Sequence, residues 1–180
     1  MIPDIDYLKS NAKVIQYFGL GFVQIKINEN TRFHFYNSDL VVTAHDDIHN
    51  HRCGFKSTIL TGSLNENIYS VSQGDEYYVK VSKCQKGVKN ELLEQKVDAK
   101  LIMSTTYYSG SHYFRYPKEF HTVSATHCIT ELFLFLPKTE NALVLIEHKE
   151  NIDYCPFVAE YSTEDLWELV NNTINIGKNK

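Results

Sequence analysis

Hydrophobic and polar residues alternate along most of this chain, and β-branched and aromatic residues are concentrated in short runs. Turn-forming Asn, Asp, Ser and Gly separate the runs, as in the stretches NEN, NSD and SQGD. Alternation with a period of two between such turns is typical of half-buried β-strands. The pattern predicts strands over residues 22–27, 31–36, 39–45, 55–64, 67–72, 76–84, 99–109, 112–117, 120–137 and 142–148.

The two ends of the chain have a different pattern, which predicts helices. Asp4 is suited to cap a helix that runs to about Tyr17, before two glycines interrupt it. Near the C-terminus, Ser162 followed by acidic residues in the sequence STED predicts the start of a helix over 162–174. The polar stretch 86–98 is compatible with a loop or a short helix.

These elements together predict one mostly β domain over residues 1–180. It would consist of an N-terminal helical segment at 1–20, a β-barrel core at 22–148 and a C-terminal helix at 162–174. The 12 Tyr and 10 Phe suit sheet faces and aromatic-lined cavities. A chain of 180 residues can bury a core without a disulfide or a structural metal, so a metal would serve function.

Composition argues against several classes of partner. With 18 basic and 22 acidic residues the net charge is −4, and no basic stripe of the kind that binds nucleic acid is present. No run reaches the roughly 18 apolar residues that cross a bilayer, and the N-terminus lacks the basic and apolar parts of a secretion signal. The four cysteines form no CxxC pair, which favours free thiols. We therefore expect a cytoplasmic protein without nucleic-acid or membrane partners.

Histidines in the stretch HDDIHNHRCGFKSTILTG, residues 45–62, are candidate metal ligands. On an extended chain, His49 and His51 would present both imidazoles on one face, about 6.6 Å apart along the strand. That spacing would let both bind one ion, and His121 in YPKEFHTVS is the best candidate for a third ligand from another strand. His45 has the same strand parity but lies four residues before the pair.

Other interpretations of these histidines remain open. HDDIH is similar to the zinc-protease motif HExxH, which requires a helix that the surrounding residues do not favour. HTV and HCIT are similar to the paired motifs of two-histidine phosphoesterases, but here both lie on one segment. Hydrogen-bonded core or surface histidines without a metal are the simplest alternative, and we interpret His34 and His148 in that way.

The histidine motifs resemble those of the cupin superfamily, a group of small jelly-roll barrels. The usual glutamate of the first motif is missing, and in the second the proline is one residue closer to the histidine than usual and the central glycine is absent. The matching residues are His49, His51 and Gly62 in the first motif and Gly110, Pro117 and His121 in the second. The resemblance implies a double-stranded β-helix, or jelly-roll barrel, with peripheral helices.

The missing glutamate changes the chemistry that the resemblance implies. Its position falls on Phe55 or Lys56, so three neutral histidines would hold the metal at its full charge. The thiol dioxygenase branch of cupins uses such a three-histidine centre with Fe(II), which makes Fe(II) the expected cofactor and Zn, Mn or Ni the alternatives. The implied function is an oxygenase acting on a small polar molecule. A non-catalytic barrel that binds a small ligand, nucleotide or sugar, and a metal-dependent isomerase, epimerase or lyase, are the alternatives.

Residues beside the motifs are candidates for binding the substrate. Arg52 and Arg115 could each bind a carboxylate or phosphate through two hydrogen bonds, although Arg52 would point away from the metal on a regular strand. Tyr113 and Tyr116 are candidate catalytic donors to bound oxygen, with simple packing as the alternative. Because residues 12–27 could extend a neighbour's sheet and so cover an exposed edge, we expect a homodimer.

Overall fold

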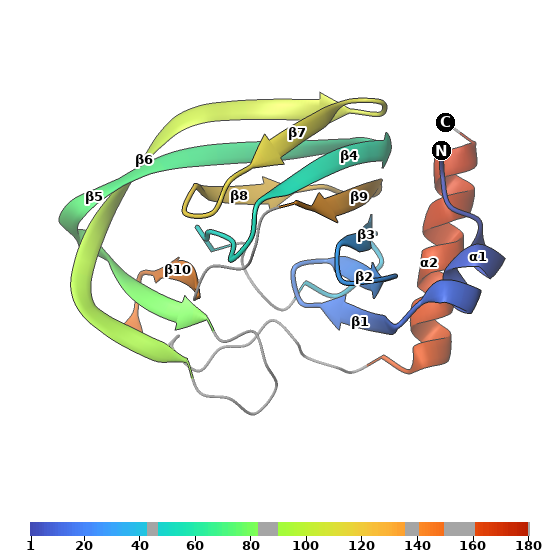
Figure 1. Cartoon of the computed structure of the whole chain (residues 1–180), viewed down its shortest axis with the longest axis horizontal. Coiled ribbons are helices and arrows are strands. Elements are labelled where there is room, and N and C mark those ends of the chain that lie inside the picture. The colour runs from blue at the N-terminus through green and yellow to red at the C-terminus, as the bar shows by residue number, and fades with distance from the viewer. Residues whose placement is uncertain (43–46, 83–89, 136–140, 150–160, 180) are drawn as a thin grey trace.

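The computed structural model describes residues 1–42, 47–82, 90–135, 141–149 and 161–179. In these residues the chain forms ten strands and two helices, with two antiparallel sheets facing each other and both helices on one side (Figure 1). The prediction of a mostly β protein with a helix near each end is confirmed. The described strands remain two separate sheets and do not close into one continuous barrel.

The first sheet has six strands, and the helices cover one of its faces while the other faces the second sheet. Its order is β1 (Val14–Phe18), β2 (Phe22–Lys26), β3 (Thr31–Tyr36), β9 (Cys128–Leu134), β4 (Phe55–Thr61) and β7 (His112–Arg115). Alternate residues of β2 and β3, such as Ile25 and Phe35, pack against the helices, whereas those between them face the second sheet. The sheet therefore separates a helix-covered core from an inner face that is available for a site.

The second sheet is built around a long curved ribbon of two strands, β5 (Ser63–Ser82) and β6 (Glu91–Tyr108). β6 pairs along most of β5, while two shorter strands pair with different parts of the remaining edge of β5. These are β8 (Phe120–Ser124), which pairs with residues 65–69, and β10 (Ala142–Ile146), which pairs with residues 78–82. Residues 70–77 of β5 separate the stretches that pair with β8 and β10.

The two helices lie side by side against the outer face of the first sheet (Figure 1). α1 (Ile5–Asn11) begins after Asp4, whose side chain accepts a hydrogen bond from the backbone N–H of Asp6 at 2.8 Å. α2 (Thr163–Lys178) begins after Ser162 with a complete capping box, as its sequence predicts. Neither helix has the length and apolar character that would let it cross a bilayer, which holds for the described part of the chain.

The prediction that the first helix runs to about Tyr17 is wrong. α1 ends at Asn11, and Val14–Phe18 forms strand β1 instead. All five residues of β1 pair with β2, and Tyr17 is buried in the core beneath the helices. Pairing with β2 therefore overrides the helical spacing of the apolar residues, because backbone hydrogen bonds and burial together outweigh a weak local preference.

The predicted strands 67–72 and 76–84 are one continuous strand, β5, which bulges at Gly74. Gln73 and Tyr77 both lie opposite Val97, so three residues are accommodated outside the regular pairing. The side chain of Asp98 accepts hydrogen bonds from two backbone N–H groups of the bulge, at 2.8 and 3.1 Å. The turn-like sequence SQGD therefore makes a bulge in a long strand, not a loop between two short ones.

Two further expectations differ from the described structure. Residues 91–98, expected as a loop or short helix, belong to strand β6, where they pair with β5. No strand is found at 39–42, and the rest of the strand predicted there lies outside the described residues, as do His45, Cys84 and Cys155.

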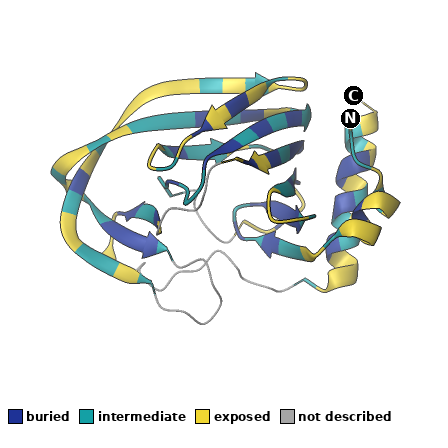
Figure 2. Ribbon diagram, in the orientation of Figure 1, coloured by how far each residue is buried: buried dark blue, intermediate teal, exposed yellow. Residues whose placement is uncertain are grey.

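Buried residues are concentrated on the facing sides of the sheets and beneath α2 (Figure 2). The packing of these inner faces positions the candidate site.

Candidate metal centre

A short segment, residues 48–50, lies between β8 and β10. The backbone N–H of His49 donates to His121 at 3.0 Å, and the N–H of His121 donates to His49 at 2.9 Å. On the other side, the N–H of Asn50 donates to the carbonyl of Leu143 in β10 at 3.0 Å. Because residues that exchange both hydrogen bonds in an antiparallel pair lie directly opposite each other, His49 and His121 project from the same face.

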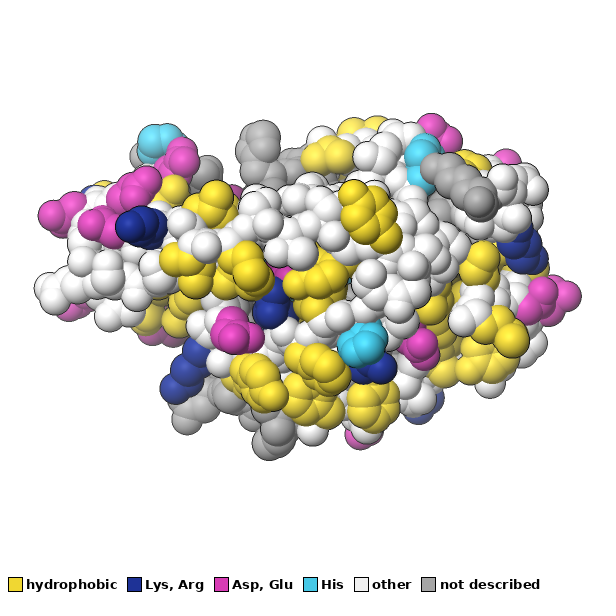
Figure 3. Space-filling view, turned by 90° about the horizontal axis from the view of Figure 1, so that it is seen from above, with side chains coloured by type: hydrophobic (Ala, Val, Ile, Leu, Met, Phe, Trp, Pro, Cys, Tyr) yellow, Lys and Arg dark blue, Asp and Glu magenta, His cyan; other side chains and the backbone are white. Residues whose placement is uncertain are grey.

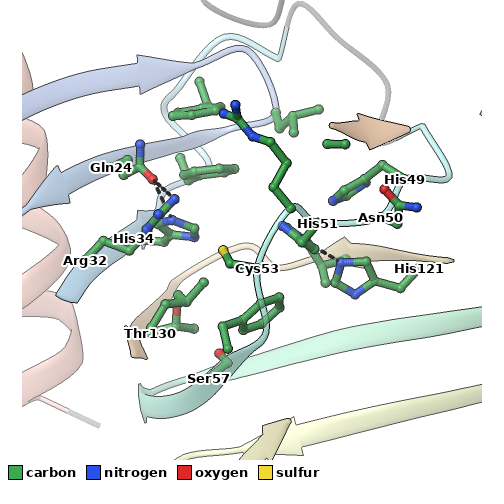
Figure 4. Close-up of a pocket in the computed structure, with 18 of the residues that line it drawn as sticks. Gln24, Arg32, His34, His49, Asn50, His51, Cys53, Ser57, His121 and Thr130 are labelled. Carbon is green, nitrogen blue, oxygen red and sulfur yellow. Dashed lines mark hydrogen bonds between the residues drawn. The ribbon is translucent and has the colours of Figure 1, made fainter. Parts of the chain in front are cut away.

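The three predicted ligands meet on this face. His49, His51 and His121 each offer a ring nitrogen, and these nitrogens all lie within 4.8 Å of one another. The Nε2 atoms of His51 and His121 are 2.8 Å apart. Two ligand nitrogens on one metal ion lie roughly 3.0–3.4 Å apart for the usual metal–nitrogen bond of about 2.1 Å. The group could therefore hold a metal ion after small ring rotations (Figure 4).

Hydrogen bonds to the far side of two rings orient them for metal binding. The Nδ1 atom of His49 lies 2.8 Å from the carbonyl oxygen of Asp47, and that of His121 lies 2.6 Å from Oε1 of Glu66. Both partners accept hydrogen bonds, so Nδ1 carries the proton in each ring. The lone pair then resides on Nε2, which is the arrangement found in metal sites with an oriented histidine.

Burial keeps the rings of His51 and His121 neutral. Desolvation lowers the pKa of His51 well below its ordinary value near 6.5, and the neighbouring rings of His121 and His49 lower it further. Desolvation also lowers the pKa of His121, with additional contributions from His49 and Arg115. A neutral imidazole is the form that binds a metal ion, so His51 and His121 are in the metal-binding form at neutral pH.

Glu66 is a part of the site that the sequence analysis missed. Its carboxylate is buried and contacts His121 and the guanidinium of Arg115. The Nε of Arg115 donates to Oε1 at 2.7 Å, and its Nη2 donates to Oε2. Burial raises the pKa of Glu66, and the hydrogen bonds from Arg115 oppose that shift. The alternation of side chains along a strand could have indicated its position. Glu66 follows Leu64 by two residues, so both lie on the same inward face of β5, where both are buried.

The four predicted substrate and catalytic residues lie in different places. Arg52 lines the pocket, because residues 52 and 53 form a bend and the alternation of a regular strand does not apply. Arg115 is held by Glu66 and does not line the described pocket, so its role in substrate binding stays a prediction. Tyr113 lines the pocket and is buried, which raises the pKa of its phenol. Tyr116 is 55% exposed, and its ring packs against that of Phe135. Other hydrophobic side chains are exposed as well, and several groups of them are visible on the face shown in Figure 3.

The three histidines open onto a cavity of about 340 Å³ between the two sheets. This volume is within the range of small-molecule sites. The ring of Phe55 lies 4.8 Å from that of His51 and forms part of the wall, as does Cys53. His34, interpreted from the sequence as non-functional, also lines the cavity, opposite the three histidines (Figure 4).

The stability of the metal-free protein should depend on pH through His34. Desolvation lowers the pKa of His34 well below 6.5, and the charges of Arg32 and Lys26 add to the shift. Below about pH 6.5 the unfolded chain then binds a proton that the folded protein does not. The contribution of His34 to the free energy of unfolding is therefore fully present above about pH 6.5. It is lost as the pH falls towards the pKa of His34 in the folded protein, at up to about 1.4 kcal/mol per pH unit.

Urea unfolding of chelator-treated protein between about pH 7 and pH 5 measures this effect. We expect the His34→Gln variant to lose less free energy of unfolding over this range than the original protein. The matched control is His148→Gln, because His148 is exposed. An equal pH dependence in the original protein and in His34→Gln would contradict the expectation.

No protein-family model matches the chain, and no curated protein sequence is significantly similar to it. The cupin resemblance of the two histidine motifs is therefore not supported by a wider match. What the structure adds is a mostly β fold with a three-histidine group that is compatible with a cupin. The geometry of this group and its pocket is therefore the basis for assigning a function.

Proposed function

We propose that this protein is a cupin-type metalloenzyme, a non-haem oxygenase in which His49, His51 and His121 bind Fe(II). One observation carries the proposal: three imidazoles converge at the wall of a pocket of small-molecule size, and two have their Nδ1 atoms held by oxygen acceptors. Two facing antiparallel sheets with the site between them are compatible with a jelly-roll barrel. The substrate would be a small polar molecule that enters this pocket.

The donor set limits which metals fit. Three imidazole nitrogens suit transition metals such as iron, zinc or nickel, whereas Mg²⁺ and Ca²⁺ prefer sites rich in oxygen ligands. Three protein ligands also leave coordination positions open for other molecules. Iron(II) bound there would supply the electrons that make molecular oxygen reactive towards an organic substrate. Zn, Mn and Ni are the alternatives, and they would indicate an isomerase, epimerase or lyase.

The residues around the group have supporting roles in this proposal. Glu66 holds the ring of His121 through its Nδ1 proton and so keeps Nε2 directed at the ion. Phe55 packs edge-on against His51 and excludes water from that side. Tyr113, protonated because burial raises its pKa, offers a neutral phenolic donor inside the pocket. These contacts would orient the substrate and shield the reacting atoms from solvent.

Metal analysis of protein purified without chelator or affinity-tag nickel tests the proposal. We expect close to one iron per chain, lost in the His49→Ala and His121→Ala variants and retained in His148→Ala, which changes an exposed histidine. Oxygen uptake would then be measured with candidate substrates. Zinc, manganese or nickel in place of iron would support the isomerase or lyase alternative, and no metal after anaerobic reconstitution would contradict the metal site.

A further inference from the structure

A row of polar side chains crosses the inner face of the first sheet, across the pocket from the three histidines (Figure 4). β2 and β3 pair with Gln24 opposite His34, and β3 and β9 pair with His34 opposite Thr130. In the next row, Lys26 lies opposite Arg32. Residues directly opposite each other project from the same face, so all five side chains point into the pocket that they line.

This polar row is connected by hydrogen bonds. Nη1 of Arg32 donates to Oε1 of Gln24 at 3.1 Å, and Nε2 of His34 lies 3.3 Å from the same oxygen. Gln24 is 2% exposed, so its amide holds the guanidinium and the imidazole in place from within the core. An arginine positioned in this way presents a planar, permanently charged group with a fixed orientation.

Thr130 supplies an independent observation. Its side chain is 1% exposed and lines the pocket, yet its hydroxyl has no hydrogen-bond partner among the described residues. Buried polar groups are almost always paired, and an unpaired one at a cavity wall indicates a missing partner. A ligand with an acceptor atom in this part of the pocket would provide that partner.

The charges around the pocket indicate the sign of the ligand. Lys26, Arg32, Arg52 and Lys80 line it, and Asp47 is the one acidic residue in the described lining. This excess of positive charge occurs in a chain with a net charge of −4. A cleft with charges of one sign and low-dielectric walls concentrates its field and attracts ions of the opposite sign.

We propose that Arg32, Lys26 and Thr130 form the subsite for an anionic group, so that the substrate is a small organic anion. The inference rests on the proposed function, because it places the uncharged end of that anion against the three histidines. Arg32 and Lys26 would bind a carboxylate or phosphate, and the Thr130 hydroxyl would donate to one of its oxygens. Both anions share this chemistry, and the test distinguishes them.

The test is a titration of the protein as purified with sodium propionate and, separately, with sodium phosphate, followed by isothermal calorimetry or NMR. We expect saturable binding that Arg32→Gln weakens at least tenfold and that high salt weakens. The tighter of the two anions identifies the substrate group. Lys100→Gln, which removes an equal charge from an exposed position on β6, is the matched control and should leave binding unchanged.

Two further variants separate this inference from the proposed function. Thr130→Val keeps the shape of the side chain, so the variant should fold normally. Its affinity for the anion should be severalfold lower, which distinguishes a loss of binding from structural damage. Binding that persists in His49→Ala would support the subsite even if no metal is found. Binding lost in His49→Ala but unchanged in Arg32→Gln would place the anion on the metal and overturn the inference, as would the absence of saturable binding.

Discussion

Replacing Glu66 with alanine is expected to lower the free energy of unfolding by about 3–5 kcal/mol, because it leaves the buried charge of Arg115 without its carboxylate partner. The guanidinium of Arg115 loses both hydrogen bonds to the carboxylate, and its side chain is only 10% exposed. Nδ1 of His121 loses its acceptor as well. Urea unfolding followed by circular dichroism measures the change, with Glu94→Ala on the exposed face of β6 as the control.

The same variant should weaken metal binding by about 10- to 100-fold, because the ring of His121 is no longer held by its partner. Glu66→Leu combined with Arg115→Leu separates the two effects. The double variant removes both charges, so it should recover much of the stability while metal affinity stays low. Equal losses of stability in the single and double variants would show that the ion pair itself is not the cause.

Gly62→Ala is expected to cost about 2–5 kcal/mol of stability through backbone strain and collision. Gly62 connects β4 to β5 with a φ of +70°, a conformation that side chains disfavour. A Cβ atom there would lie 2.0 Å from the backbone carbonyl oxygen of His127. The carbonyl of Gly62 also accepts a hydrogen bond from Ser109 at 3.0 Å, so the turn has little freedom to move.

Gly110→Ala is the matched control for this prediction. Gly110 has a similar φ of +89°, but a Cβ atom there would meet no atom within 4 Å. Its substitution should therefore show the cost of the left-handed conformation alone, on the order of 1 kcal/mol. Thermal or urea unfolding of both variants gives the comparison, and equal losses would contradict the collision with His127.

The grouping of the three histidines could be predicted from the sequence because strand geometry is regular. His49 and His51 are two residues apart on an extended segment, and the backbone pairing of His49 with His121 brings the third ring to the same face. Strand character was likewise predictable wherever alternation was clear, as at Thr31–Tyr36, whose predicted bounds match those of β3. In both cases the positions follow from the alternation of side chains along an extended segment, which can be seen in the sequence itself.

Features that depend on long-range partners could not be predicted in this way. Arg52 reaches the pocket because the chain bends after His51. The alternation of a regular strand predicted that its side chain would point away from the metal. Glu66 reads as an ordinary polar residue until the partners Arg115 and His121 are known, from positions 49 and 55 residues away. The bulge at Gly74 depends on Asp98 across the ribbon, so the local turn sequence was misleading.

The position of residues 48–50 has a consequence for the order in which the protein assembles. The segment joins β8 and β10, because His49 bonds to His121 and Asn50 bonds to Leu143, both far along the sequence. Contacts of such long sequence separation form after local ones, such as the hairpin of β5 and β6. The three histidines thus come together late, and an ion that they bind contributes little to the rate of folding and mainly slows unfolding.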